Sequence, residues 1–161
     1  MIDQNKVAEF AIFKEIDAGN LGAILAGGQE LRFETGAVVM KEDEAGPDSD
    51  LYIILDGRVE VLLESKVVQS GIPVHKRVAI LQQGEVFGEI GLLESRRRSA
   101  QIKAYGTLSV LKVSRATLFD QIAKNPRLGY LFMRNLASIL SDRLVDMNFM
   151  WRDEIGAENS G

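Results

Sequence analysis

Residues 84–100 read Gly-Glu-Val-Phe-Gly-Glu-Ile-Gly-Leu-Leu-Glu-Ser-Arg-Arg-Arg-Ser-Ala, and they contain the parts of a site for an anion. Two glycines bracket Glu89 and lead into a short helical turn, whose free backbone N–H groups would attract a phosphate. Arg98 follows nine positions after Glu89, and a guanidinium can bind two phosphate oxygens at once. An ionised carboxylate only accepts hydrogen bonds, so Glu89 suits a sugar hydroxyl and not a phosphate.

The sequence from Glu30 to about Val113 has the pattern of short strands separated by glycine turns. Residues 51–55 form a compact β-rich run, and Asp56-Gly57 predicts a tight turn that pairs this run with the next strand in a hairpin. Further strands are expected at 32–33, 38–41, 66–69, 78–81, 100–104 and 108–113. The regular spacing of strands and turns predicts an antiparallel sandwich or barrel rather than alternating βαβ units.

Helical patterns flank this strand region on both sides. Residues 3–26 carry apolar side chains at helical spacing, and Ser114 can cap a helix that Asn125-Pro126 ends. Pro126 suits the first turn of a long helix that we expect to reach residue 155, followed by a disordered tail at 156–161. One apolar seam runs along this helix through Leu136, Leu140, Leu144, Met147 and Trp151.

Each piece of the 84–100 segment also has an ordinary explanation, because most glycine turns are plain turns and consecutive arginines usually mark a solvated loop. The spacing and the flanks together favour a more specific interpretation. Phe-Gly-Glu-Ile-Gly-Leu-Leu followed by Arg-Ser-Ala resembles the phosphate-binding cassette of cyclic nucleotide-binding domains. That family includes the bacterial catabolite activator protein and the regulatory subunits of cyclic-AMP-dependent protein kinase. The resemblance covers about residues 10–150, including the Asn125-Pro126 joint.

The resemblance implies a fold that is mainly β with flanking helices (α+β), built around an antiparallel β jelly-roll barrel. One cyclic nucleotide-binding domain would span residues 1–155, with N-terminal helices at 3–26, the barrel at 30–113 and C-terminal helices at 114–155. The phosphate-binding cassette would occupy residues 84–100 of the barrel.

The resemblance also assigns ligand-binding roles, position by position. The expected ligand-binding residues are Gly88, Glu89, Ile90, Gly91, Arg98, Ser99, Ala100 and Arg143. Glu89 would accept a hydrogen bond from the ribose 2′-hydroxyl, Arg98 would pair with the phosphate oxygens, and Ser99 would donate to the phosphate or the base. The N–H groups of Gly91 and Ala100 would complete the anion site.

Three further residues of this segment have simpler expected roles. Gly88 would allow the backbone to approach the ligand closely. Arg96 and Arg97 are expected to be exposed and to raise the local positive potential.

The identity of the base is less strongly encoded. In the family, small residues at the Ser99 position occur in cyclic AMP binders and threonine often goes with cyclic GMP, so Ser99 favours cyclic AMP over cyclic GMP. The final helix normally covers the base, and an ungapped count from Asn125-Pro126 places Arg143 and Leu144 there, where the catabolite activator has threonine and serine. Arg143 either stacks its guanidinium on the purine or is a solvated helix residue. Leu140 and Leu144 are equally consistent with the core of a dimer.

Composition excludes several other classes of protein. The 161 residues include 19 basic and 23 acidic side chains, and this net charge of −4 argues against DNA binding through the bulk surface. The absence of cysteine and the presence of one histidine, His75, exclude disulfide scaffolds and most zinc sites. The N-terminus does not resemble a signal peptide and no apolar run is long enough to span a membrane. We therefore expect a cytoplasmic protein with no DNA or membrane partner and no helix-turn-helix element.

We interpret the chain as a non-enzymatic cyclic nucleotide sensor whose ligand shifts the C-terminal helix, which an unidentified downstream protein reads. The seam at 136–151 predicts a homodimer, because it would otherwise form a large exposed apolar patch. Gly129 is either a flexible point of this helix or a close-packing residue.

Two alternatives remain open at this point. One is a structural or interaction protein that kept the fold, lost the ligand and acts through the 136–151 surface. The other is an enzyme of the cupin kind, for which the sequence shows no His-and-Glu metal cluster.

Overall fold

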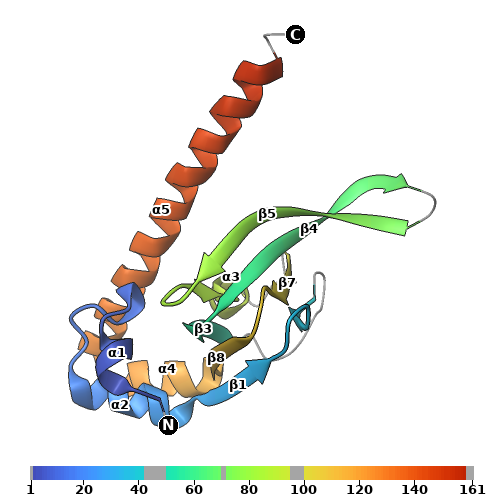
Figure 1. Cartoon of the computed structure of the whole chain (residues 1–161). Coiled ribbons are helices and arrows are strands. Elements are labelled where there is room, and N and C mark those ends of the chain that lie inside the picture. The colour runs from blue at the N-terminus through green and yellow to red at the C-terminus, as the bar shows by residue number, and fades with distance from the viewer. Residues whose placement is uncertain (1, 42–49, 70–71, 95–99, 159–161) are drawn as a thin grey trace.

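The computed structural model describes residues 2–41, 50–69, 72–94 and 100–158. The helices are α1 (Gln4–Ala8), the 3-10 helix η1 (Ala11–Phe13), α2 (Ala18–Gly27), α3 (Glu89–Glu94), α4 (Arg115–Lys124) and α5 (Pro126–Glu158). The strands are β1 (Gln29–Phe33), β2 (Val38–Met40), β3 (Leu51–Asp56), β4 (Arg58–Gln69), β5 (Ile72–Gln82), β6 (Val86–Phe87), β7 (Gln101–Ala104) and β8 (Leu108–Val113). Helices α1, α2 and α4 and the base of α5 gather at one end of the strands, α3 lies among the strands, and the rest of α5 projects away (Figure 1).

The described strands form two antiparallel four-stranded sheets. The first sheet has the order β1-β8-β3-β6 and the second has the order β2-β7-β4-β5. This arrangement confirms the predicted fold, mainly antiparallel β with N-terminal helices and a long C-terminal helix. The strands expected at 66–69 and 78–81 are the ends of the longer β4 and β5, which pair from Arg58↔Gln82 to Gln69↔Ile72.

The predicted hairpin across Asp56-Gly57 is wrong, because β3 and β4 belong to different sheets. Both edges of β3 are already occupied, one by β6 and the other by β8, so neither edge is free for β4. Gly57, with a φ of 88°, instead turns the chain from the first sheet into the second. At this crossing its Cα lies against the turn between β7 and β8, where an added Cβ would lie 3.2 Å from the Cα of Leu108.

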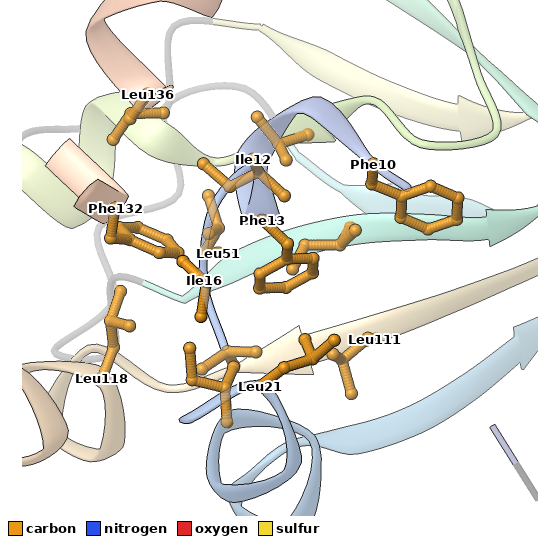
Figure 2. Packing of buried hydrophobic residues seen from close by; sticks show 14 of the residues in the cluster. Phe10, Ile12, Phe13, Ile16, Leu21, Leu51, Leu111, Leu118, Phe132 and Leu136 are labelled. Carbon is orange, nitrogen blue, oxygen red and sulfur yellow. The ribbon is translucent and has the colours of Figure 1, made fainter. Parts of the chain in front are cut away.

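The continuous apolar run of β3 is explained by burial on both of its faces. Side chains alternate across a strand, so Leu51 and Ile53 point to one side and Tyr52 and Ile54 to the other. The first pair belongs to a core between the first sheet and the helices, and the second pair belongs to a core between the two sheets. Figure 2 shows Leu51 in the helical core with Phe13 and Phe132. β3 therefore joins the two cores of the molecule.

Capping residues define the helical boundaries near the C-terminus as the sequence predicted. The Ser114 hydroxyl accepts a hydrogen bond from the Thr117 N–H at 3.1 Å, at the start of α4. Asn125 ends α4, and its side-chain oxygen accepts the Leu128 N–H at 3.2 Å in the first turn of α5.

Helix α5 differs from the prediction at its far end and resolves the role of Gly129. It continues through Glu158, which corrects the expected end at 155 and the disordered tail from Gly156, because a single glycine costs only about 1 kcal/mol in a helix. Residues 159–161 lie outside the described residues. Gly129 is a close-packing residue, since an added Cβ would lie 2.6 Å from Cγ2 of Ile122 on α4.

The crossing at Gly57 generates a stability prediction. Gly57→Ala should lower the free energy of unfolding by more than about 3 kcal/mol, because the added Cβ would overlap the carbonyl oxygen of Thr107. Gly106→Ala is the matched control, since Gly106 has a similar φ of 93° with open space around it and should cost only about 1–2 kcal/mol. Equilibrium unfolding in urea measures both variants. Equal losses would contradict the close approach to Thr107.

Candidate functional site

The segment singled out by its sequence leaves β6, passes through Gly88 and enters α3. Gly88 has a φ of 84°, which L side chains rarely adopt, and this turn directs the chain from strand into helix. The carbonyl of Gly88 accepts the Leu92 N–H at 3.2 Å, and Leu92 is fully buried in the helical core. The packing of Leu92 in the helical core therefore fixes the start of α3.

The predicted site residues differ in their exposure. Gly88, Glu89, Gly91 and Ala100 are buried, and Ile90 is 41% exposed. Glu89 is 8% exposed, so the carboxylate expected to bind a sugar hydroxyl lies almost wholly inside the protein. A buried carboxylate is costly unless it is paired or hydrogen-bonded.

The partner of Glu89 is Arg143, which lies 54 positions away on α5. Its Nη1 donates to Glu89 Oε1 at 3.1 Å, and its Nη2 donates to the backbone carbonyl of Val86 on β6. The same Nη2 lies 3.9 Å from an oxygen of Glu85, a weaker ion-pair contact. The Arg143 side chain is only 25% exposed, so the alternative that it is a solvated helix residue is wrong. Stacking of Arg143 on a base stays a prediction.

One polar atom of Arg143 has no partner among the described residues. Its Nε is buried and donates to no described acceptor. A buried donor without an acceptor costs about 1–3 kcal/mol. The two Nη groups therefore hold the guanidinium in place, although its Nε has no hydrogen-bond partner among the described residues.

Helix α5 is attached to the rest of the protein at its base. The Asn135 amide donates to the carbonyls of Ile12 and Lys14 at 3.0 and 2.8 Å, and Arg134 pairs with Glu15 at 3.2 Å. The hydrogen bond from Arg134 holds the pKa of Glu15 below its ordinary value. Along residues 141–152 every side chain is exposed except Arg143. Among residues 141–152, Arg143 is therefore the one that attaches α5 to the body.

Several predicted residues cannot be placed. Arg98 and Ser99, together with Arg96 and Arg97, lie outside the described residues, and their expected roles stay predictions. The described structure brings Gly88, Glu89, Ile90, Gly91 and Arg143 together. Ala100 immediately precedes β7.

Sequence reasoning missed two parts of this arrangement. It did not identify the Val86 carbonyl and Glu85 as partners of Arg143, because residues on β6 and α5 have no local signal that they meet. It also missed the stacking of Phe87 on Tyr52, whose ring centroids lie 4.9 Å apart and fix β6 against β3.

A family model for the cyclic nucleotide-binding domain matches residues 30–125, a range that includes the whole described site except Arg143. The chain belongs to the cyclic nucleotide-binding domain family. Domains of this family are regulatory rather than catalytic. In the part of the chain that the structure describes, no helix is long and apolar enough to cross a membrane.

Similar proteins extend this comparison. Glutaminase 2 of Bradyrhizobium diazoefficiens is 31% identical over 142 residues, which are 88% of this chain and 21% of that enzyme. This chain thus spans about a fifth of the length of that relative. The crystal structure of the catabolite activator protein of Thermus thermophilus matches with a TM-score of 0.72 and 24% identity, covering 88% of this chain and 62% of that one. The regulatory domain of Toxoplasma gondii PKA, crystallised with cAMP, matches with a TM-score of 0.65 and 21% identity, covering 84% and 48%.

The turn at Gly88 generates a second prediction. Gly36→Ala should lower the free energy of unfolding by about 1–2 kcal/mol, and Gly88→Ala by at least as much, because both positions have a φ near 80° and Gly88 is also buried. Only Gly88→Ala should also weaken cyclic nucleotide binding, by about tenfold or more, since it displaces the neighbouring Glu89. Urea unfolding and titration with a fluorescent cyclic AMP analogue measure the two effects. An unchanged affinity of Gly88→Ala would show that this turn does not shape the site.

Proposed function

We propose that this chain is a cyclic nucleotide sensor module, with cyclic AMP as its preferred ligand, and that it signals through α5. The observation that carries the proposal is the buried carboxylate of Glu89, at the start of α3 in a chain of this family. A nearly buried carboxylate contributes little to solubility, and its position after the Gly88 turn suits recognition of a sugar hydroxyl. Its bond to Arg143 links the ligand site directly to α5.

The preference for cyclic AMP over cyclic GMP rests on Ser99, because small residues at this position occur in cyclic AMP binders of the family, whereas both nucleotides share the same phosphate. The cyclic phosphate carries one negative charge, which Arg98 would neutralise, and the Ser99 hydroxyl would donate to the phosphate or the base. The PKA regulatory domain of similar fold was crystallised with cAMP, which supports the same choice here.

Signalling through α5 is supported by the way this helix is held. Its base is fixed to η1 through Asn135, whereas residues beyond Arg143 extend away from the body (Figure 1). A ligand that binds more tightly to one position of α5 than to another shifts the population of helix positions. A downstream protein that contacts the free part of α5 would read this shift.

We further propose that α5 pairs with its copy in a homodimer. The apolar seam predicted at 136–151 is exposed only in its later part, because Leu136 is buried in the helical core and Leu140 packs against that core. Beyond them, large apolar side chains of α5 are exposed at Leu144, Val145, Met147, Phe149, Met150 and Trp151. Leu144, Met147 and Trp151 share one face of the helix because their spacing is three and four residues. Contiguous exposed apolar surface of this kind favours association.

The phosphate contact provides the central test of the proposed function. Arg98→Ala should weaken cyclic AMP binding by about 2–5 kcal/mol, or about 30- to 5,000-fold, because the phosphate charge would lose its partner. Arg98→Lys should lose less, since it keeps the charge but not the two-pronged geometry. Isothermal titration calorimetry against cyclic AMP and cyclic GMP measures these effects.

Arg96→Ala and Arg97→Ala are the matched controls, and each should cost less than about tenfold in affinity. If Arg98→Ala binds like the parent protein while a neighbouring substitution abolishes binding, the assignment of the phosphate contact to Arg98 is wrong. If the parent protein binds neither nucleotide, the sensor proposal is wrong and an interaction role of the exposed apolar face at 144–151 takes its place.

The dimer proposal has its own test. The chain should elute as a dimer at tens of micromolar in size-exclusion chromatography with light scattering, and Met147→Glu should convert it to a monomer because it places a charge in the apolar face. Phe149→Glu is the matched control, since Phe149 is 58% exposed on the opposite side of α5 and its substitution should leave the dimer intact. A monomeric parent protein, with or without nucleotide, would contradict the dimer.

A further inference from the structure

We infer that Met147 and Met150 of α5 form a reversible oxidation site, and that their conversion to methionine sulfoxide by a hydroperoxide separates the α5 homodimer. This inference rests on the proposed function, because it names a way in which the proposed dimer is regulated. It concerns the outer half of α5 and does not involve the nucleotide.

The first step is the unequal exposure of the sulfur atoms. The sequence contains five methionines and no cysteine, so every sulfur atom belongs to a thioether. Met40 is only 9% exposed in the core between the sheets, and Met133 is partly buried against the helical core. Met147 and Met150 are 51% and 56% exposed in the single chain. Because an oxidant must reach the sulfur, these two react first among the described methionines. Met1 lies outside the described residues.

The second step is the position of the two exposed sulfurs on α5. Met147 follows Leu144 by three residues and precedes Trp151 by four, so it lies in the middle of the apolar face proposed to pair with a second copy. Met150 follows Met147 by three residues and borders the same face. One exposed sulfur therefore lies within the proposed interface and the other lies at its edge.

The chemical step is a two-electron oxidation at sulfur. A lone pair of the methionine Sδ attacks one oxygen of hydrogen peroxide, the O–O bond breaks and an S–O bond forms. The proton on the transferred oxygen passes to the leaving hydroxide, which departs as water, so the sulfur is oxidised and the peroxide is reduced. A sulfoxide is polar, and burying it in an apolar interface without a hydrogen-bond partner costs free energy that the thioether does not cost. Oxidation therefore favours the monomer, and methionine sulfoxide reductases reverse it.

The dimer itself should protect its sulfurs, because paired α5 helices would cover Met147. Oxidation of this residue then proceeds through the monomer and prevents it from pairing again. By mass action, a higher protein concentration leaves a smaller fraction of the chain monomeric. The oxidation rate of Met147 should therefore fall as the protein concentration rises, a dependence that a sulfur outside an interface would not show.

The experiment treats the purified chain with hydrogen peroxide and locates each sulfoxide by peptide mass spectrometry. Met147 and Met150 should be oxidised before Met40 and Met133. The dissociation constant of the dimer, measured by light scattering over a dilution series, should rise by at least about tenfold. Methionine sulfoxide reductases should restore the dimer. The chain has one tryptophan, Trp151, which is 61% exposed on the pairing face, so its emission should shift to longer wavelength on oxidation and return on reduction.

The test variant combines Met147→Leu with Met150→Leu, because leucine keeps a similar apolar volume without an oxidisable sulfur. Each variant is compared with itself before and after peroxide. The double variant should keep its dissociation constant after the treatment. Met133→Leu is the matched control, since it removes a partly buried sulfur from the same helix and should leave the dimer as sensitive to peroxide as the parent.

The outcomes separate this inference from the proposed function. A parent chain that is monomeric before any peroxide is added would overturn the dimer and the inference with it. A dimer that persists with sulfoxide at both Met147 and Met150 would overturn the inference and leave the dimer standing. Dissociation of the double leucine variant by peroxide, or oxidation of Met40 and Met133 as fast as that of the exposed pair, would also overturn the assignment of the site.

Discussion

The burial of β3 on both of its faces is the constraint on which the rest of the molecule depends. Leu51 and Ile53 complete the core under the helices, and Tyr52 and Ile54 complete the core between the sheets. Because the strand is shared, neither core can shift without the other, and protein interiors are packed too densely to absorb such a shift. β3 therefore couples the helical core to the core between the two sheets.

The candidate site depends on β3 indirectly, through the neighbouring strand β6. Phe87 of β6 stacks on Tyr52 of β3, and the next residue is Gly88, where the chain turns into α3. Leu92 secures the other side of α3 in the helical core. The carboxylate of Glu89 is therefore held on a packed support, from which it reaches Arg143 of α5.

Arg143 pairs with the buried carboxylate of Glu89 at the point where α5 leaves the body of the protein. A carboxylate as buried as Glu89 requires a partner, and in this protein the partner belongs to the helix that carries the exposed apolar surface. The base of α5 is fixed by Asn135, whereas its outer half makes no buried contact beyond Arg143 in residues 144–152. The ion pair therefore lies between the part of α5 that is fixed and the part that is exposed.

Local features of the sequence determined much of this protein in advance. Ser114, Asn125 and Pro126 define the ends of α4 and α5 through capping and φ restriction, which act within a few residues. The motif around Glu89 pointed to the family through its resemblance, and Gly88 within it has the positive φ that favours glycine. The alternation of apolar residues also predicted most strands.

Tertiary structure alone decided the remaining features, because they depend on residues that are distant in sequence. Asp56-Gly57 has the local chemistry of a hairpin, yet β6 and β8 occupy both edges of β3 and send the chain into the other sheet. The sequence shows that position 143 carries a positive charge. Whether this charge contacts solvent, a base or a carboxylate depends on how α5 packs beside β6. Its pairing with Glu89 joins residues 54 positions apart, and only the packing of the helices against β3 brings them within hydrogen-bonding distance.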